Sequence, residues 1–260
     1  MSVESDVVTL EIDGNIATIT LNRPERKNAL SVTLARDLGE AVEHVSETEA
    51  RVGILAGAGN TFSAGGDLDQ SPDEFIDEVS AAIDAIEEIH TSPVPYIAAV
   101  EGAAVGGGLE LALACDLRIT GESASLGFPE TKVGIFPCAG GTRLLPRMIG
   151  ATRAKDLLLT GRLISGEQAA EWGLVNRAVE ATAVRDIAHD LAETIGANSP
   201  TGIAATLRSA NEAFGRPVIE GTRWDVELAR TVAHHPDFRE GKNAFLDERS
   251  PEFEEREPLF

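Results

Sequence analysis

Apolar and polar residues alternate in two short stretches near the start of the chain, at residues 7–12 and 16–21. A period of two is typical of half-buried strands, and the intervening Asp13-Gly14-Asn15 is a sequence that forms tight turns. The pattern therefore predicts a β-hairpin. Further strands are predicted at residues 51–56, which would be buried, and at 96–100, 117–120 and 175–179.

Apolar residues spaced three or four apart predict helices between these strands. Ser31 is a favourable N-cap for a segment whose apolar positions are Leu34, Leu38, Ala41, Val42 and Val45. Ser71-Pro72 begins a second helix, with an expected apolar face of Phe75, Val79, Ile83, Ile86 and Ile89. A third helix is expected over residues 109–115. Because strands and helices alternate, we expect a mostly parallel sheet.

Helical periodicity predominates after about residue 141. Serine-containing start signals at residues 165–168 and 199–201 support this interpretation. Helices are predicted at residues 144–149, 154–159, 166–172, 184–195, 201–214 and 218–233. We therefore predict an α/β core over residues 1–195, followed by a helical region over residues 196–260.

The composition is that of a globular protein. The 260 residues are 43% hydrophobic, which is sufficient for a large core. No apolar run is long enough to span a bilayer, and the first residues lack the features of a signal peptide, so a cytoplasmic location is expected. The two cysteines, Cys115 and Cys138, lie outside any CxxC or histidine-rich motif, and no metal or redox site is predicted.

The net charge of −21 restricts the partners of the chain. Repulsion makes nucleic acid and anionic membranes unfavourable partners. The 22 basic residues comprise four lysines and 18 arginines. An excess of acid with few lysines is similar to proteins from a salt-rich cytoplasm, where screening weakens self-repulsion. A halophilic origin is therefore a hypothesis, beside that of an ordinary acidic protein.

Two glutamates lie beside glycine-rich segments. Glu110 follows Gly106-Gly107-Gly108, Glu130 follows Gly127, and a third glycine cluster occupies residues 62–67. Amides in the first turn of a helix have no intrahelical partner and attract negative charge. Two carboxyl groups beside such amides indicate proton chemistry next to a carbonyl group. Taken singly, each feature also has a structural interpretation: close packing for the glycines, an exposed loop for Glu130 and a helix cap for Asp67.

In this order, the segments resemble the crotonase superfamily, the enoyl-CoA hydratase/isomerase proteins. The matching segments are residues 21–30, 62–68, 102–116 and 129–144, with a further match at 160–175. The resemblance implies an α/β fold, a spiral of ββα turns with two roughly perpendicular sheets. It also implies that the helical C-terminal region mediates assembly into a trimer or a dimer of trimers.

The resemblance also implies roles for individual residues. The amides of Gly66 and Gly107 match the oxyanion hole, and Glu110 and Glu130 match the catalytic pair of the hydratases. The implied coenzyme A contacts are Arg26, Lys27, Ala29, Leu30, Ala64, Asp67 and Leu68. The implied acyl pocket contains Phe136, Pro137 and Cys138, of which Cys138 replaces a glycine that is usual in the hydratases.

The expected function is hydration of a trans-2-enoyl-CoA thioester to 3-hydroxyacyl-CoA. Glu110 would activate water and Glu130 would protonate the α-carbon, with mutual repulsion keeping one carboxyl protonated. No cofactor is expected, since coenzyme A belongs to the substrate, and no metal. Alternatives are an enoyl-CoA isomerase or another enolate-forming member, a non-catalytic acyl-CoA-binding protein, and an RNA-binding relative, against which the charge argues. For Cys138, a substituted pocket wall is favoured over a nucleophile.

Overall fold

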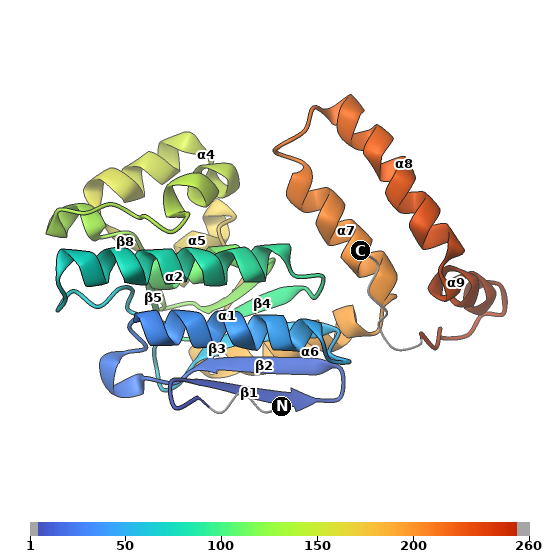
Figure 1. Ribbon diagram of the computed structural model, residues 1–260, viewed down its shortest axis with the longest axis horizontal. Coiled ribbons are helices and arrows are strands. Elements are labelled where there is room, and N and C mark those ends of the chain that lie inside the picture. The colour runs from blue at the N-terminus through green and yellow to red at the C-terminus, as the bar shows by residue number, and fades with distance from the viewer. Residues whose placement is uncertain (1–4, 254–260) are drawn as a thin grey trace.

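Two sheets form the centre of the molecule, and the computed structural model describes residues 5–253 (Figure 1). The larger sheet contains, in spatial order, β1 (Val8–Asp13), β2 (Ile16–Leu21), β3 (Val52–Gly57), β4 (Tyr96–Val100), β6 (Leu117–Gly121) and β9 (Arg177–Val179). The smaller contains β5 (Ala103–Val105), β7 (Ser125–Gly127) and β8 (Leu163–Ser165). The pairs β1–β2 and β7–β8 are antiparallel, and the other pairs are parallel.

The larger sheet confirms the predicted hairpin and the four further strands, of which β3 is buried along its whole length as expected. The smaller sheet was not predicted from periodicity, because its strands contain only three residues each. A stretch of that length contains too few positions for an alternation to be recognised. The smaller sheet nevertheless joins the segments that carry the two glutamates.

Nine α-helices occur within residues 5–253. They are α1 (Val32–Ser46), α2 (Pro72–Thr91), α3 (Gly107–Ala114), α4 (Gly141–Thr160), α5 (Gly166–Trp172), α6 (Val184–Gly196), α7 (Pro200–Glu212), α8 (Val218–His234) and α9 (Pro236–Leu246). The described chain also contains short 3-10 helices, η1 (Pro24–Arg26), η2 (Glu130–Val133) and η3 (Ala181–Ala183). Ser31 and Ser71 cap α1 and α2 as predicted, since their side chains accept from the amides of the third helical residues. The two helices predicted at 144–149 and 154–159 form one run, interrupted by Gly150 at φ 78°.

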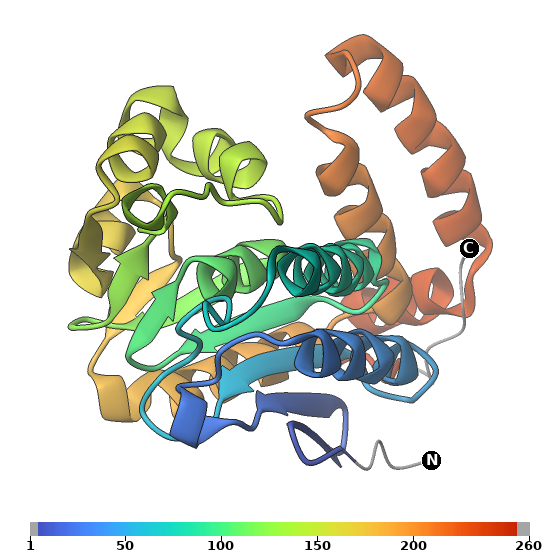
Figure 2. The ribbon, with the colours of Figure 1, turned by 60° about the vertical axis from the view of Figure 1, so that its left-hand side comes forward.

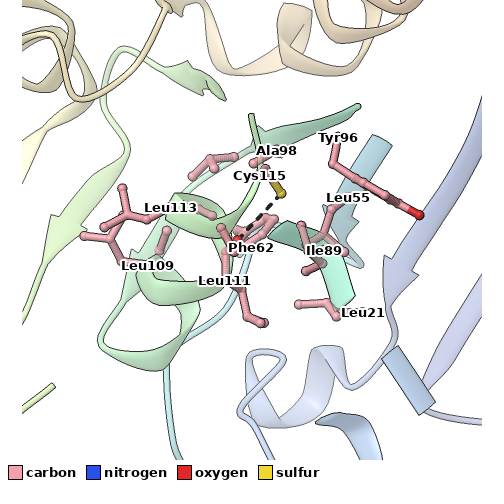
Figure 3. Close-up of a cluster of buried hydrophobic side chains, with 14 of the residues drawn as sticks. Leu21, Leu55, Phe62, Ile89, Tyr96, Ala98, Leu109, Leu111, Leu113 and Cys115 are labelled. Carbon is pink, nitrogen blue, oxygen red and sulfur yellow. Dashed lines mark hydrogen bonds between the residues drawn. The ribbon is translucent and has the colours of Figure 1, made fainter. Parts of the chain in front are cut away.

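Helices cover both faces of the larger sheet. Leu55 of β3 belongs to the core beneath α1, α2 and α3, whereas Ile54 and Ala56 belong to a second core beneath α6. Because both faces are buried, β3 is apolar throughout rather than alternating. Figure 3 shows how Leu109 and Leu111 of α3 enter the first core. This packing fixes the position of α3, whose first turn carries Gly107.

The buried face of α2 differs from the predicted one. Its fully buried apolar positions are Ala81, Ala82, Ala85 and Ile89, whereas Ile83 is 42% exposed. The reason is the close approach of α1, where Gly39 faces Ala85. Small side chains allow the two helix backbones to come together, so size rather than hydrophobicity determines the contact face.

Helices α7 and α8 form an arm that stands away from the sheets (Figures 1 and 2). Large apolar side chains are exposed on α8 and α9, among them Val218, Ile219, Phe245 and Leu246. The expected role of residues 196–260 in trimerisation stays a prediction, and residues 1–4 and 254–260 lie outside the described part. Over residues 5–253, no helix has the length and apolarity needed to cross a membrane.

Replacement by alanine should change the free energy of unfolding in opposite directions at Gly39 of α1 and Gly53 of β3. A methyl group at Gly39 would lie 3.7 Å from Cα of Ala85, an ordinary contact, and alanine is the better helix former. We expect Gly39→Ala to raise the free energy of unfolding by about 0.5–1 kcal/mol. At Gly53 the methyl would lie 2.2 Å from the buried ring of Tyr96, so Gly53→Ala should lower stability by about 1–3 kcal/mol. Denaturant unfolding of both variants tests this, and equal changes of one sign would contradict it.

Candidate active site

The first turn of α3 presents an unpaired amide. The amides of Leu109 and Glu110 donate to the carbonyl of Gly106, at 2.8 and 3.0 Å. Within residues 5–253, no hydrogen bond is found from the amide of Gly107. Gly106 adopts φ 56°, and a side chain there would come within 3.0 Å of Glu130 Oε1. Glycine is therefore required where the chain turns into the helix.

The segment around Gly66 lies directly beside this turn. The amide of Ser63 donates to Ala103 at 3.0 Å, and the amide of Val105 donates to Ser63 at 3.0 Å. An ideal Cβ on Gly107 would lie 3.8 Å from the nitrogen of Gly66. No hydrogen bond from the Gly66 amide is found in the described chain either. The structure thus brings the two predicted oxyanion-hole residues together.

Asn28 connects the predicted coenzyme A loop to this arrangement, and sequence reasoning missed it. Its buried side chain donates to the carbonyls of Ala58 at 2.9 Å and Thr61 at 2.7 Å, and accepts from the amide of Arg23 at 2.9 Å. Its φ of 53° is left-handed, a conformation that asparagine tolerates better than most residues. An Asn in a Pro-containing loop is the signal that could have identified it.

The predicted oxyanion-hole pair and the predicted glutamate pair line one cavity of about 300 Å³. Its lining includes Gly66, Gly107, Glu110 and Glu130. Among the predicted coenzyme A contacts, Leu30, Ala64, Asp67 and Leu68 line the same cavity. Arg26, Lys27 and Ala29 lie outside its lining. Arg26 forms an ion pair with Asp67 at 2.7 Å, and this hydrogen bond holds the pKa of Asp67 below its usual range.

The predicted acyl-pocket residues separate into two groups. Phe136 and Cys138 line the cavity, whereas Pro137 is buried and lies outside the lining. The thiol of Cys138 donates to the carbonyl of Phe136 at 2.8 Å. Burial, and then the charge of Glu110, raise the pKa of this thiol. A thiol that stays protonated is a poor nucleophile, which favours the interpretation of Cys138 as a pocket wall.

Glu110 is held by backbone amides. Its Oε1 accepts from Ala139 at 2.9 Å and from Gly141, at the start of α4, at 2.8 Å. Burial raises the pKa of Glu110, while these two hydrogen bonds act in the opposite direction. The amides and the adjacent helix N-terminus stabilise the ionised form of this carboxyl group.

Glu130 occupies a different environment. It lies at the start of η2, is buried, and its Oε2 has no hydrogen-bond partner in the described chain. Burial raises its pKa to about 7. An unpaired, desolvated carboxyl group favours the protonated form.

The cause of the difference in acidity between Glu110 and Glu130 is not the one expected from the sequence. The sequence led us to expect that repulsion between Glu110 and Glu130 keeps one carboxyl protonated. Repulsion from Glu110 does raise the pKa of Glu130, but desolvation is the larger cause. Burial of each carboxyl group and the number of amides it accepts from therefore distinguish the two glutamates.

A third carboxyl group, that of Glu78, also lines the cavity and was missed from the sequence. It lies on α2, is 3% exposed, and its Oε1 would be 2.6 Å from a Cβ on Gly66. The expected apolar face of α2 did not include this position. Across the described residues, no group of three or more His, Cys, Asp or Glu side chains could hold a metal ion.

The sequence is similar to those of known proteins over nearly its whole length. Residues 11–256 match the family model described as enoyl-CoA hydratase/isomerase. The chain is 39% identical to (E)-benzylidenesuccinyl-CoA hydratase of Thauera aromatica, covering 95% of this chain and 98% of the relative. It is 38% identical to enoyl-CoA hydratase EchA19 of Mycobacterium tuberculosis, covering 95% and 96%.

A solved structure shows the same fold. The enoyl-CoA hydratase of Bacillus anthracis aligns with a TM-score of 0.92 and 37% identity, covering 95% of this chain and 98% of that one. The α/β architecture with its helical C-terminal region therefore has the predicted crotonase fold. From the family match, these relatives and the shared fold together, the chain belongs to the enoyl-CoA hydratase/isomerase family.

Proposed function

We propose that the protein is an enoyl-CoA hydratase, which adds water across the double bond of a trans-2-enoyl-CoA thioester. One observation carries the proposal: two carboxyl groups in unlike environments line one cavity with two unpaired backbone amides. Hydration needs a group that accepts a proton from water and a group that donates one to carbon. The two environments suit these two tasks.

In the proposed mechanism, the amides of Gly66 and Gly107 bind the thioester oxygen. They polarise the carbonyl group and stabilise the enolate that forms when water attacks the β-carbon. Glu110, ionised, accepts the proton of that water. Glu130, protonated, delivers a proton to the α-carbon and completes the addition. Coenzyme A is part of the substrate, so these steps require no further cofactor.

The relatives support an acyl-CoA substrate without identifying the acyl group. Of two proteins of nearly equal similarity, one is named as a hydratase of (E)-benzylidenesuccinyl-CoA and the other as an enoyl-CoA hydratase, with no acyl group specified. Isomerisation of a 3-enoyl-CoA remains the alternative, since an isomerase would also use an enolate. Turnover of crotonyl-CoA and of a 3-enoyl-CoA by the same preparation separates these reactions.

Replacement of either glutamate by glutamine should abolish most of the hydration. Glu110→Gln and Glu130→Gln preserve side-chain size but remove proton transfer, which contributes about 10²–10⁴-fold. We expect kcat for crotonyl-CoA to fall by that factor in each variant. Dissociation constants for a saturated acyl-CoA should change little. Near wild-type turnover in either variant would refute the assigned roles.

The rate should decline on the alkaline side of neutrality. The active form of Glu130 is protonated, and its pKa is about 7, so kcat/KM should fall as pH rises through about 7. On the acid side, kcat/KM should fall as Glu110 gains a proton. A pH–rate profile measures both effects. Cys138→Ala removes the neighbouring thiol and should leave the alkaline decline in place; a shift of that decline would assign it to the cysteine.

The same pKa predicts an effect of pH on stability. Folding favours the neutral form of Glu130, so its contribution is complete below the usual carboxyl range and is lost as pH rises through about 7. Glu130→Gln cannot ionise. Its free energy of unfolding relative to wild type should therefore increase between pH 5 and pH 8, by up to about 3 kcal/mol. The exposed Glu122→Gln serves as the control; an equal trend in both variants would contradict the prediction.

A further inference from the structure

The proposed mechanism leaves Glu78 without a role, although it is the third buried carboxyl group of the cavity. Its side chain is 3% exposed and lies among Phe75, Val79 and Ala82 of α2 on the cavity wall. Burial raises its pKa. A carboxyl group in such a wall lowers stability unless hydrogen bonds or a ligand compensate for its lost hydration.

Hydrogen bonds compensate for one of its two oxygens. Oε2 accepts from the amide of Asp67 at 3.4 Å and from the side chain of Gln70 at 3.1 Å. These contacts fix the direction of the side chain. They also connect α2 to the segment that follows Gly66, so the carboxyl group is held against the oxyanion hole.

The other oxygen is directed at the cavity. Oε1 occupies the space beside Gly66 where a side chain would otherwise lie, at 2.6 Å from the ideal Cβ position. Over residues 5–253, no hydrogen bond to Oε1 is found and Oε1 is not among the enclosed, unpartnered oxygens. Glu78 therefore presents an oriented carboxyl oxygen that can still accept a hydrogen bond from a molecule bound in the cavity.

The part of the cavity next to Glu78 is the part left for the acyl group. With the thioester oxygen on Gly66 and Gly107, coenzyme A extends past Leu30 and Ala64. The remaining lining is largely apolar, formed by α2 and by residues 133–138. Of the other charged lining residues, Asp67 is paired with Arg26, and Lys132 lies against Gly161.

We propose that Glu78 selects acyl groups that are apolar but carry one hydrogen-bond donor, such as a hydroxyl group, and disfavours acyl groups that carry a second carboxylate. A hydroxyl group would donate to Oε1 and restore the hydrogen bonding that burial removes. A second carboxylate would instead face Glu78 across a poorly hydrated cavity. This inference rests on the proposed function, because it places the acyl group beside α2.

Binding of saturated esters tests the inference independently of catalysis, because such esters cannot be hydrated. The probes are a graded series of ω-hydroxyacyl-CoA esters, their alkyl partners with methyl in place of hydroxyl, and the corresponding dicarboxylic monoesters. At the best chain length, titration calorimetry of the wild-type protein should show about tenfold tighter binding of the hydroxyl ester than of its alkyl partner. The dicarboxylic monoester should bind weakest.

Variants of α2 separate a specific role from a general charge effect. Glu78→Leu should bind the alkyl ester more tightly than the hydroxyl ester. Glu78→Gln should keep the tighter binding of the hydroxyl ester and should bind the dicarboxylic monoester more tightly than the wild-type protein does. Asp77→Asn removes the same charge from the neighbouring exposed position and should leave the ratio unchanged. Glu78→Gln keeps an acceptor for Asp67, so its result holds even if Glu78→Leu unfolds.

The possible failures are distinguishable. If the esters bind but no hydroxyl preference exists at any length, or if Glu78→Gln leaves all ratios unchanged, the inference is wrong and the proposed function stands. If no acyl-CoA ester binds, the proposed function is wrong and the inference fails with it.

Discussion

The close approach of two backbone segments at the N-terminus of α3 is the constraint on which the site depends. The ladder between Ser63 and residues 103–105 brings the nitrogen of Gly66 beside the first turn of the helix. This approach tolerates no side chain: a Cβ on Gly108 would lie 2.5 Å from the carbonyl of Ser63. The core fixes the helix from below, through Leu109 and Leu111 (Figure 3). The proposed oxyanion hole is therefore a consequence of packing, which positions two amides without using any side chain.

The two glutamates of the cavity, Glu110 and Glu130, show how one cavity can hold two carboxyl groups of unlike acidity. Both are desolvated, which alone would make both protonated. Two amides donate to Glu110, whereas one oxygen of Glu130 has no partner in the described chain. Hydrogen bonding thus decides which carboxyl group ionises first. One of the two donors, the amide of Gly141, begins α4, so the proposed base depends on an element that supplies no side chain to the proposed mechanism.

The sequence predicts those features that short-range rules govern. The hairpin and the serine caps follow from local periodicity and turn chemistry, and ordered motifs identified Gly66, Gly107, Glu110 and Glu130, which meet at the cavity. Features that depend on distant contacts could not be predicted. The buried face of α2 follows from the approach of Gly39 on α1. The role of Asn28 follows from carbonyls about 30 positions away in the chain.

The cavity has two halves with different physical origins, and this division bears on how substrate preference arises. One half carries the backbone amides of Gly66 and Gly107, to which the proposed mechanism assigns the thioester oxygen, and their positions follow from the sheet ladder and the core. Side chains of α2 and of residues 133–138 form the half left for the acyl group. A side chain added in the first half would clash with backbone, whereas Glu78 and Cys138 line the second half with side chains. Under the proposed function, reaction type and acyl preference are therefore assigned to different elements. The two halves of the cavity meet where Glu78 contacts Gly66. There a carboxyl group of the half proposed for the acyl group lies directly against a residue of the proposed oxyanion hole.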